Sequence, residues 1–177
     1  MRAIPIATAS ALLAAALASQ PADAATRSYP TQSNPADACQ LSIPTTDTKV
    51  RPKATGFRNE GSTNAFIICS FSDIEWNSLT RALVWFVTLD ELPHDITCTG
   101  VIGIAQNEGP NLLYSSKTVT AAPYSYGAPR SIQWIPVDFG GTYPFFTQTY
   151  TFSFTCLLPP QVAIVWMEAE KTLEIGQ

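Results

Sequence analysis

The residues of this chain best suited to catalysis are closely spaced carboxylates. Two acids suffice for a glycosidase, because one protonates the leaving group while the other acts as nucleophile or base. Acids two residues apart on a strand also point to the same face. A chain with 14 acidic residues produces such pairs by chance as well, so a small hydrolase is an alternative hypothesis here. The candidate pairs are Asp73 with Glu75, Asp90 with Glu91, and Glu168 with Glu170.

Other catalytic signals are sparse. The sequence lacks the G-x-S-x-G, H-E-x-x-H, P-loop and Rossmann patterns. Its single histidine, His94, precedes Asp95 in an expected turn and could serve a Ser-His-Asp site, although a solvated turn residue is the more ordinary interpretation. With one histidine and no C-x-x-C pair, we expect no metal site and no cofactor.

Two surfaces are candidates for binding. Aromatic rings in two consecutive proline- and glycine-rich connections could stack on a glycan, or they could cap the open end of the core. These rings are Tyr124, Tyr126, Tyr143 and Phe145, with Phe139 beside them. A basic segment could contact an anion, or its charge could protect an edge segment from pairing with other chains. Its residues are Lys49, Arg51, Lys53 and Arg58, and alternation places the first three on one face.

The first 24 residues have the features of a secretory signal peptide. Arg2 gives a positive start, residues 3–18 carry no charge, and Ala22-Asp23-Ala24 supplies a cleavage site of small residues. The apolar run is shorter than the ~20 residues needed to cross a bilayer. We therefore expect a secreted or periplasmic protein with no membrane span in the mature chain.

The cysteines agree with export. Four cysteines in an oxidising compartment predict two disulfides, and three pairings are open. Alternation places Cys39, Cys98 and Cys156 on apolar faces of their strands. We favour Cys39–Cys69 as a local closure and Cys98–Cys156 as a link between two long strands.

Composition excludes several protein classes. The chain has 177 residues, of which 46% are apolar and 14% charged, and its net charge is −4. These values argue against disorder, against a basic nucleic-acid-binding protein and against a large multidomain enzyme. We expect residues 25–37 to form a flexible N-terminal arm and residues 38–177 a single domain.

Period-2 alternation and regular turn signals predict about eight short strands. They are expected near 38–43, 64–71, 81–89, 96–105, 112–121, 132–139, 145–157 and 162–169. Pro136 suggests that 132–139 is an edge strand, and a helix is an alternative over 164–173. The pattern predicts an all-β, two-sheet antiparallel sandwich, either immunoglobulin-like or jelly-roll-like.

The stretch CQLSIPTTDTKVRPKATGFRNEG with the later AFIIC, together with CLLPPQVAIV, resembles a group of small exported bacterial proteins of uncharacterised function. The resemblance implies export and a β domain, and no functional residues. Our leading hypothesis is a non-catalytic module that binds a glycan or another cell-surface ligand. The alternatives are a structural or surface-assembly protein that uses an edge strand, and a small carboxylate-dependent hydrolase.

Overall fold

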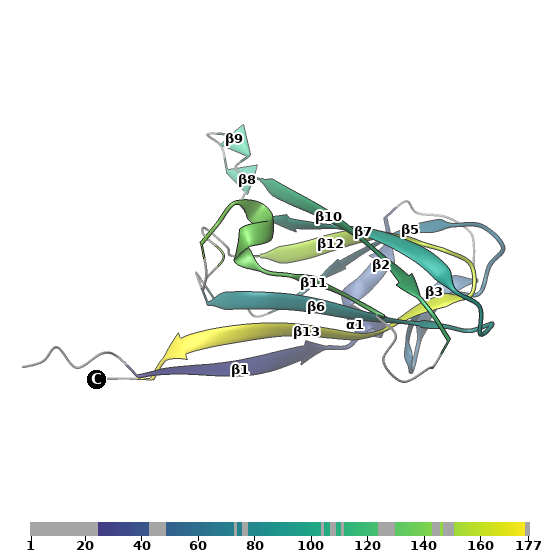
Figure 1. The fold of residues 1–177 in the computed structure, drawn as a ribbon, viewed down its shortest axis with the longest axis horizontal. Coiled ribbons are helices and arrows are strands. Elements are labelled where there is room, and N and C mark those ends of the chain that lie inside the picture. Colours follow the sequence, from purple (N-terminus) through teal and green to yellow (C-terminus); the bar gives the residue numbers. More distant parts are fainter. Residues whose placement is uncertain are drawn as a thin grey trace, which may run out of the picture.

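The chain folds as the expected two-sheet antiparallel β-sandwich (Figure 1). The computed structural model describes residues 25–42, 49–72, 74–75, 78–103, 105–106, 109–110, 112–123, 130–142, 146 and 151–175. The predicted signal peptide, residues 1–24, lies outside this part of the chain.

The first sheet has six strands, and the candidate site described below lies on it. Five strands follow the order β11-β6-β13-β4-β3, while β1 also pairs with β13. The long strand β13 therefore has two successive partners on one side, first β4 and then β1. The strand bounds are β1 Thr26–Ser33, β3 Val50–Lys53, β4 Gly56–Asn59, β6 Leu79–Thr88, β11 Ser131–Trp134 and β13 Val162–Glu174.

The second sheet has five strands in the order β10-β7-β12-β5-β2. A two-stranded sheet of β8 and β9 lies apart from it, and two short helices, α1 and the 3-10 helix η1, connect strands. The bounds are α1 Pro35–Ala38, β2 Cys39–Leu41, β5 Ala65–Ser70, β7 His94–Ile102, β8 Ala105–Gln106, β9 Gly109–Pro110, β10 Leu113–Ala121, η1 Pro136–Phe139 and β12 Phe152–Leu158.

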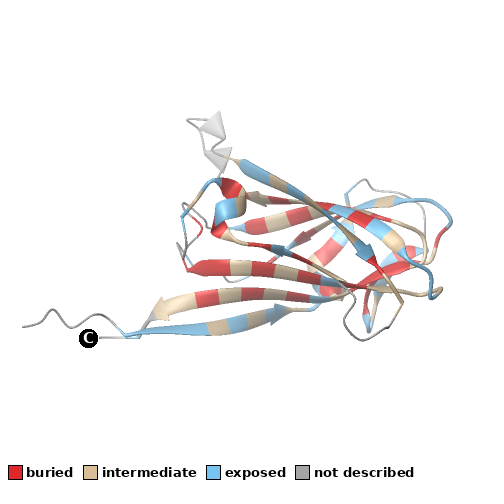
Figure 2. Ribbon diagram, viewed as in Figure 1, coloured by how far each residue is buried: buried red, intermediate tan, exposed pale blue. Residues whose placement is uncertain are grey.

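Buried residues alternate with less buried ones along the strands of both sheets (Figure 2), and the buried side chains form one core cluster. Trp134 is fully buried, and its indole nitrogen donates to the carbonyl of Ser115 at 3.0 Å. Its ring packs against Phe152 and Phe154, with centroids 5.5 and 5.6 Å away. Aromatic pairs at such distances add to the stabilisation that comes from area burial alone.

Both predicted disulfides are confirmed. Cys39 is bonded to Cys69 and Cys98 to Cys156. In each case the two cysteines are direct partners on neighbouring strands, β2 with β5 and β7 with β12. Both bonds therefore lie within the second sheet, and neither joins the two sheets.

Three expectations from the sequence need correction. The flexible arm expected over 25–37 contains β1, which is antiparallel to β13 from Thr26↔Glu174 to Ser33↔Met167. Backbone pairing with a long strand orders the polar residues 26–33 despite Pro30. The helix alternative over 164–173 is also wrong, because β13 continues through it.

The third correction concerns the edge strand expected over 132–139. The edge position is right, but the strand ends at Trp134 and Pro136 begins η1. Proline removes a backbone donor and fixes φ near the helical value, which suits the first turn of a helix.

An extra residue interrupts the pairing of β13 with β6. Ile164 pairs with Phe86, but Trp166 pairs with Trp85, so Val165 is inserted as a β-bulge. On the opposite side of β13, Gly56 lies so close that an added Cβ would be 2.1 Å from the Ile164 carbonyl oxygen. Only glycine allows β4 to approach the bulged strand in this way.

Alanine at Gly56 tests this close approach. Gly56 and Gly140 both have positive φ, 128° and 76°, but a Cβ at Gly140 would meet nothing within 4 Å. We expect Gly140→Ala to lower the free energy of unfolding by about 1 kcal/mol through backbone strain alone. Gly56→Ala adds a backbone clash and should cost more than about 3 kcal/mol. Urea denaturation measures both, and equal costs would contradict the proposed role of Gly56.

Removal of each disulfide tests the contribution of loop closure. Cys98–Cys156 spans 58 residues and Cys39–Cys69 spans 30. The loop-entropy model gives stabilisations of about 4 and 3.5 kcal/mol, respectively. We expect the double variant C98A/C156A to unfold at lower urea concentration than C39A/C69A, and the reverse order would contradict the loop-length argument.

Candidate functional site

Two tryptophans lie side by side on the outer face of the first sheet. Trp85 of β6 and Trp166 of β13 are direct cross-strand partners. They are 45% and 39% exposed, whereas their neighbours Val84, Phe86 and Met167 are fully buried. Adjacent exposed apolar side chains mark interaction sites more often than singly scattered ones do.

The bulge at Val165 is what turns Trp166 outward. Ile164 faces the core opposite Phe86, so strict alternation would place residue 165 outside and residue 166 inside. The inserted residue shifts the alternation by one position, and Trp166 joins Trp85 on the outer face. Bulges next to functional sites commonly redirect a side chain in this way.

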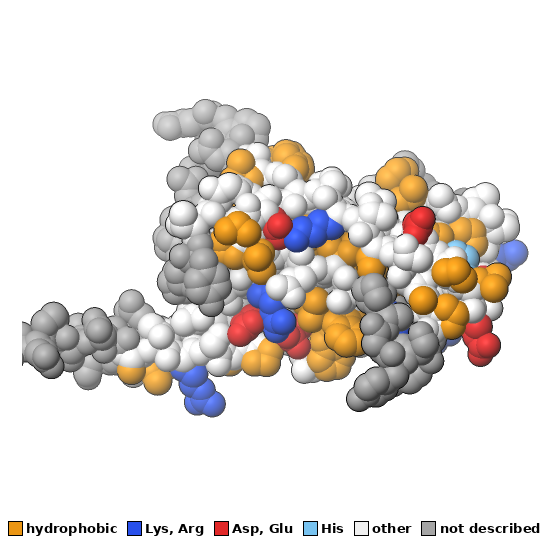
Figure 3. Space-filling model, viewed as in Figure 1, with side chains coloured by type: hydrophobic (Ala, Val, Ile, Leu, Met, Phe, Trp, Pro, Cys, Tyr) orange, Lys and Arg blue, Asp and Glu red, His pale blue; other side chains and the backbone are white. Residues whose placement is uncertain are grey.

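A charged cluster borders the tryptophans. Arg81 of β6 donates from Nη2 to Glu168 Oε1 at 2.9 Å, and its Nε lies 2.9 Å from Glu170 Oε2. The three side chains are between 16% and 34% exposed, so they are fixed by each other and still reach solvent. In Figure 3 a basic side chain flanked by acidic ones lies next to hydrophobic side chains over β6 and β13.

These residues line a hollow of about 530 Å³, which is within the size range of ligand sites. Neighbouring strands extend the polar surface around it. Gln133 of the edge strand β11 is opposite Leu83, and Gln32 of β1 is opposite Glu168. Both glutamines are exposed. The lining residues are Arg81, Leu83, Trp85, Val165, Trp166 and Glu168.

The arrangement is suited to binding a ligand with both an apolar face and hydroxyl groups. The indoles offer flat apolar area, while Arg81 offers donors and Glu168 offers acceptors at its border. Glu168 was a candidate acid from the sequence, but Arg81 engages both Glu168 and Glu170. The structure therefore places this pair in an ion-pair network beside the tryptophans.

The aromatic loop site predicted from the sequence falls on residues outside the described part of the chain. Tyr124, Tyr126, Tyr143 and Phe145 all lie outside the described residues. Phe139, their neighbour in sequence, is buried and packs against Phe146 with a centroid distance of 5.6 Å. Phe139 therefore belongs to the core, in agreement with the capping alternative for that residue.

The basic segment forms a hairpin at the other edge of the first sheet. Arg51 of β3 is opposite Arg58 of β4. Glu60 lies 3.3 Å from Lys53 Nζ, 3.8 Å from Arg51 and 3.9 Å from Arg58. One carboxylate thus offsets part of the positive charge. Lys49 precedes β3 and is exposed.

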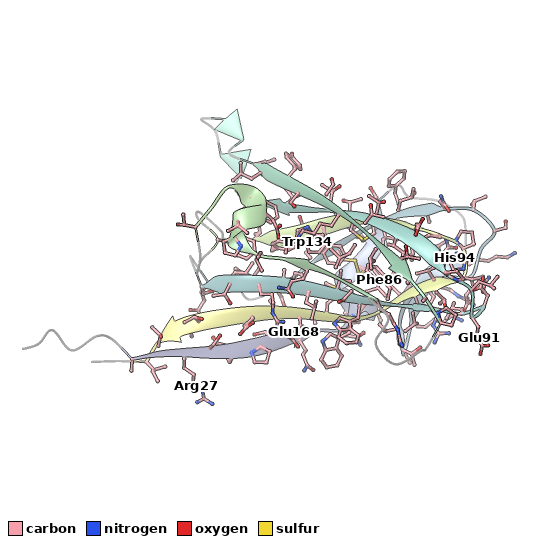
Figure 4. The ribbon with its side chains drawn as sticks, in the orientation of Figure 1. Arg27, Phe86, Glu91, His94, Trp134 and Glu168 are labelled. Carbon is pink, nitrogen blue, oxygen red and sulfur yellow. A yellow bond between two sulfur atoms is a disulfide. The ribbon has the colours of Figure 1, made fainter. Side chains whose placement is uncertain are left out.

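His94 lies at one end of the sandwich, away from Glu168 (Figure 4), and its ring contacts a carboxylate. Its Nε2 lies 3.0 and 2.9 Å from the two carboxylate oxygens of Asp90. Partial burial disfavours the charged form of Asp90, but the backbone amide of Leu92 and the His94 ring outweigh this effect and lower its pKa. Asp95 instead accepts a hydrogen bond from Thr120.

Metal-binding clusters are absent from the part of the chain that the structure describes. No group of three histidine, cysteine, aspartate or glutamate side chains is placed there to hold an ion. Asp73, one member of a candidate acid pair, is outside the described residues, and its neighbour Glu75 is described.

The two tryptophans were not predicted as a site. The run over 81–89 is apolar on both faces, which suits a central strand and gives no reason to expect an exposed tryptophan. The signal that was available is the row Arg81, Leu83 and Trp85, which alternation places on one face with a charge at its end. Trp166 gave no such signal, because a bulge is not visible in the local pattern.

No protein-family model and no curated protein sequence matches this chain. Among solved structures, it is similar to the crystal structure of the Podospora anserina GH26-CBM35 β-(1,4)-mannanase, with a TM-score of 0.37 and 8% sequence identity. The match covers 79% of this chain and 27% of the mannanase chain, so this chain spans well under half the length of that protein.

Proposed function

We propose that this protein is a non-catalytic module that binds a glycan on the outer face of its first sheet. The observation that carries the proposal is the pair of exposed tryptophans, Trp85 and Trp166, fixed side by side next to Arg81 and Glu168. In this proposal the two tryptophans, and not the loop aromatics, form the main surface that contacts the glycan.

The chemistry of sugars fits both parts of the site. The C–H groups on one face of a pyranose ring carry partial positive charge and meet the negative face of an indole favourably. The hydroxyl groups at the ring edge need donors and acceptors once water is displaced. Arg81 and Glu168 supply both, and their ion pair fixes their geometry before the ligand arrives, which lowers the entropic cost of binding.

Export is part of the same proposal. Disulfides persist in oxidising compartments and are rare where thiols are kept reduced. Both disulfides are intact here, and the sequence begins with the features of a signal peptide. Among the described residues, no helix is long and apolar enough to span a membrane. A secreted or periplasmic location places the tryptophan face where extracellular glycans are found.

The two alternative functions have less support. Edge-strand assembly would use β11, but this strand has four residues, and Lys117 Nζ donates to the Gln133 carbonyl at 2.7 Å. Two other edges carry prolines, Pro30 in β1 and Pro52 in β3, and prolines limit pairing with further strands. For a hydrolase, the acids of the site are engaged by Arg81.

Alanine variants of the tryptophans test the site. We expect Trp85→Ala and Trp166→Ala each to weaken binding by about 10- to 100-fold, the usual effect of removing a tryptophan from the centre of an interface. A glycan array with the oxidised 25–177 chain would identify the ligand, and calorimetric titration would measure the loss. Phe66→Ala is the matched control, because Phe66 is 52% exposed on the other sheet. Equal losses in all three variants, or none in the tryptophan variants, would contradict the proposal.

The loop aromatics remain a separate prediction from the sequence. If they also contact the glycan, Tyr124→Ala and Tyr143→Ala should each weaken binding without lowering the melting temperature. The same titration decides between the two surfaces. Unchanged affinity in both tyrosine variants, alongside loss in Trp85→Ala, would reject the loops and retain the sheet face.

A further inference from the structure

Trp166 separates two hollows on the same face of the sandwich. The first, of about 530 Å³, contains Trp85 and Arg81, and the second has a volume of about 390 Å³. Val165 and Trp166 line both of them. The bulged segment of β13 therefore forms a ridge with a hollow on either side.

The second hollow results from the change of partner along β13. Strand β4 pairs with β13 up to Ile164, and β1 pairs with it from Met167 onward. Between these two partners the sheet has a notch at Val165 and Trp166. The notch is bordered by the end of β1, the start of α1 and the turn between β3 and β4, through Gln32, Ser33, Asn34, Pro35, Ala54 and Thr55.

The two hollows differ in chemistry. The first combines apolar rings with one ion pair, whereas the second combines apolar residues with amide and hydroxyl side chains and has no charged lining residue. Part of its polar capacity is already used, because the Asn34 side chain accepts from the Ala36 amide and Thr55 contacts Arg58. Gln32 is exposed and available for a ligand.

We infer that the ligand is a neutral oligosaccharide chain that crosses Trp166, with sugar units in both hollows. The inference rests on the proposed function and adds the form of its ligand. Each hollow alone is within the size range of a small-ligand site, so a single sugar would leave one of them empty. A chain that fills both gains contacts without a second loss of translational freedom, as in any multivalent ligand.

The charges favour a neutral chain over an acidic one. The charged lining residues of the two hollows, Arg81 and Glu168, neutralise each other, and Glu170 adds a negative charge nearby. A uronic acid unit would therefore meet no unpaired cation in these hollows. Glu60 offsets part of the positive charge of the hairpin residues Arg51, Lys53 and Arg58, and none of these three side chains lines the second hollow.

Chain length is the variable that tests the inference. The probes are neutral β-1,4-linked oligosaccharides of glucose, mannose, xylose and N-acetylglucosamine, with one to six units, and oligogalacturonate as the acidic comparison. With the oxidised 25–177 chain, we expect affinity for one of the neutral series to rise at least 10-fold between two and five units. Oligogalacturonate should bind more weakly than that series.

Variants of the second hollow make the test specific. Gln32→Ala combined with Thr55→Ala should reduce the affinity for five-unit chains to that for two-unit chains, and leave two-unit binding unchanged. Trp85→Ala should weaken binding at every length. Thr118→Ala, on the other sheet, is the control for a surface hydroxyl, and melting temperatures verify that each variant is folded.

The outcomes separate the two proposals. Binding that is lost in Trp85→Ala but does not depend on chain length would retain the glycan-binding function and overturn the two-hollow inference. Tighter binding of oligogalacturonate than of the neutral series would overturn the inference that the ligand is neutral. A third outcome is that no probe binds, while the protein forms a dimer that Trp85→Ala abolishes. This outcome would overturn both proposals, and it would assign the tryptophan face to contact with a second copy of the chain.

Discussion

The register of β13 against β6 is the constraint on which both the core and the candidate site depend. Upstream of Val165, Ile164 faces Phe86 in the core, and downstream Met167 faces Val84. Ile164 and Met167 are three residues apart, and both face the core only because the bulge places Val165 and Trp166 together opposite Trp85. Regular alternation through the same residues would bury Trp166 and expose Met167, so the bulge that keeps the core filled also creates the tryptophan pair. Gly56 allows this by leaving space for the bulged backbone.

The covalent cross-links and the candidate site lie on different sheets. Both disulfides cross-link the second sheet, while the tryptophans, the ion-pair cluster and both hollows lie on the first. The sheets are held to each other by packing around Trp134, Phe152 and Phe154. A covalently cross-linked sheet and a close-packed core together support the outer face of the first sheet, and such support keeps the side chains of the candidate site in place.

Local alternation and turn spacing were sufficient to predict the sandwich, because alternation shows which face of a strand a residue occupies. Alternation placed three of the cysteines on apolar faces, but the favoured pairing rested on a local closure and on a link between two long strands, and both bonds are present. Alternation failed where tertiary pairing decides the outcome. The polar segment of β1 is ordered only by β13, and Pro136 ends β11 early by starting a helical turn. The exposure of Trp85 was not predicted, because the sequence around it is apolar on both faces of the strand. Trp166 was hidden because its orientation depends on a bulge and on Gly56, which is distant in the sequence.

The antiparallel pairing of β1 with β13 also determines how the domain responds to mechanical load. Thr26 and Glu174 are register partners, so the chain enters and leaves the first sheet at the same point. A force that pulls these two residues apart would break the hydrogen bonds between β1 and β13 one after another, starting from this end. It would not load all of these bonds at once in shear. The end of β1 that carries Gln32 and Ser33, which form the wall of the second hollow, would be the last part to detach. The candidate site would therefore remain complete while the opposite end of β1 had already separated.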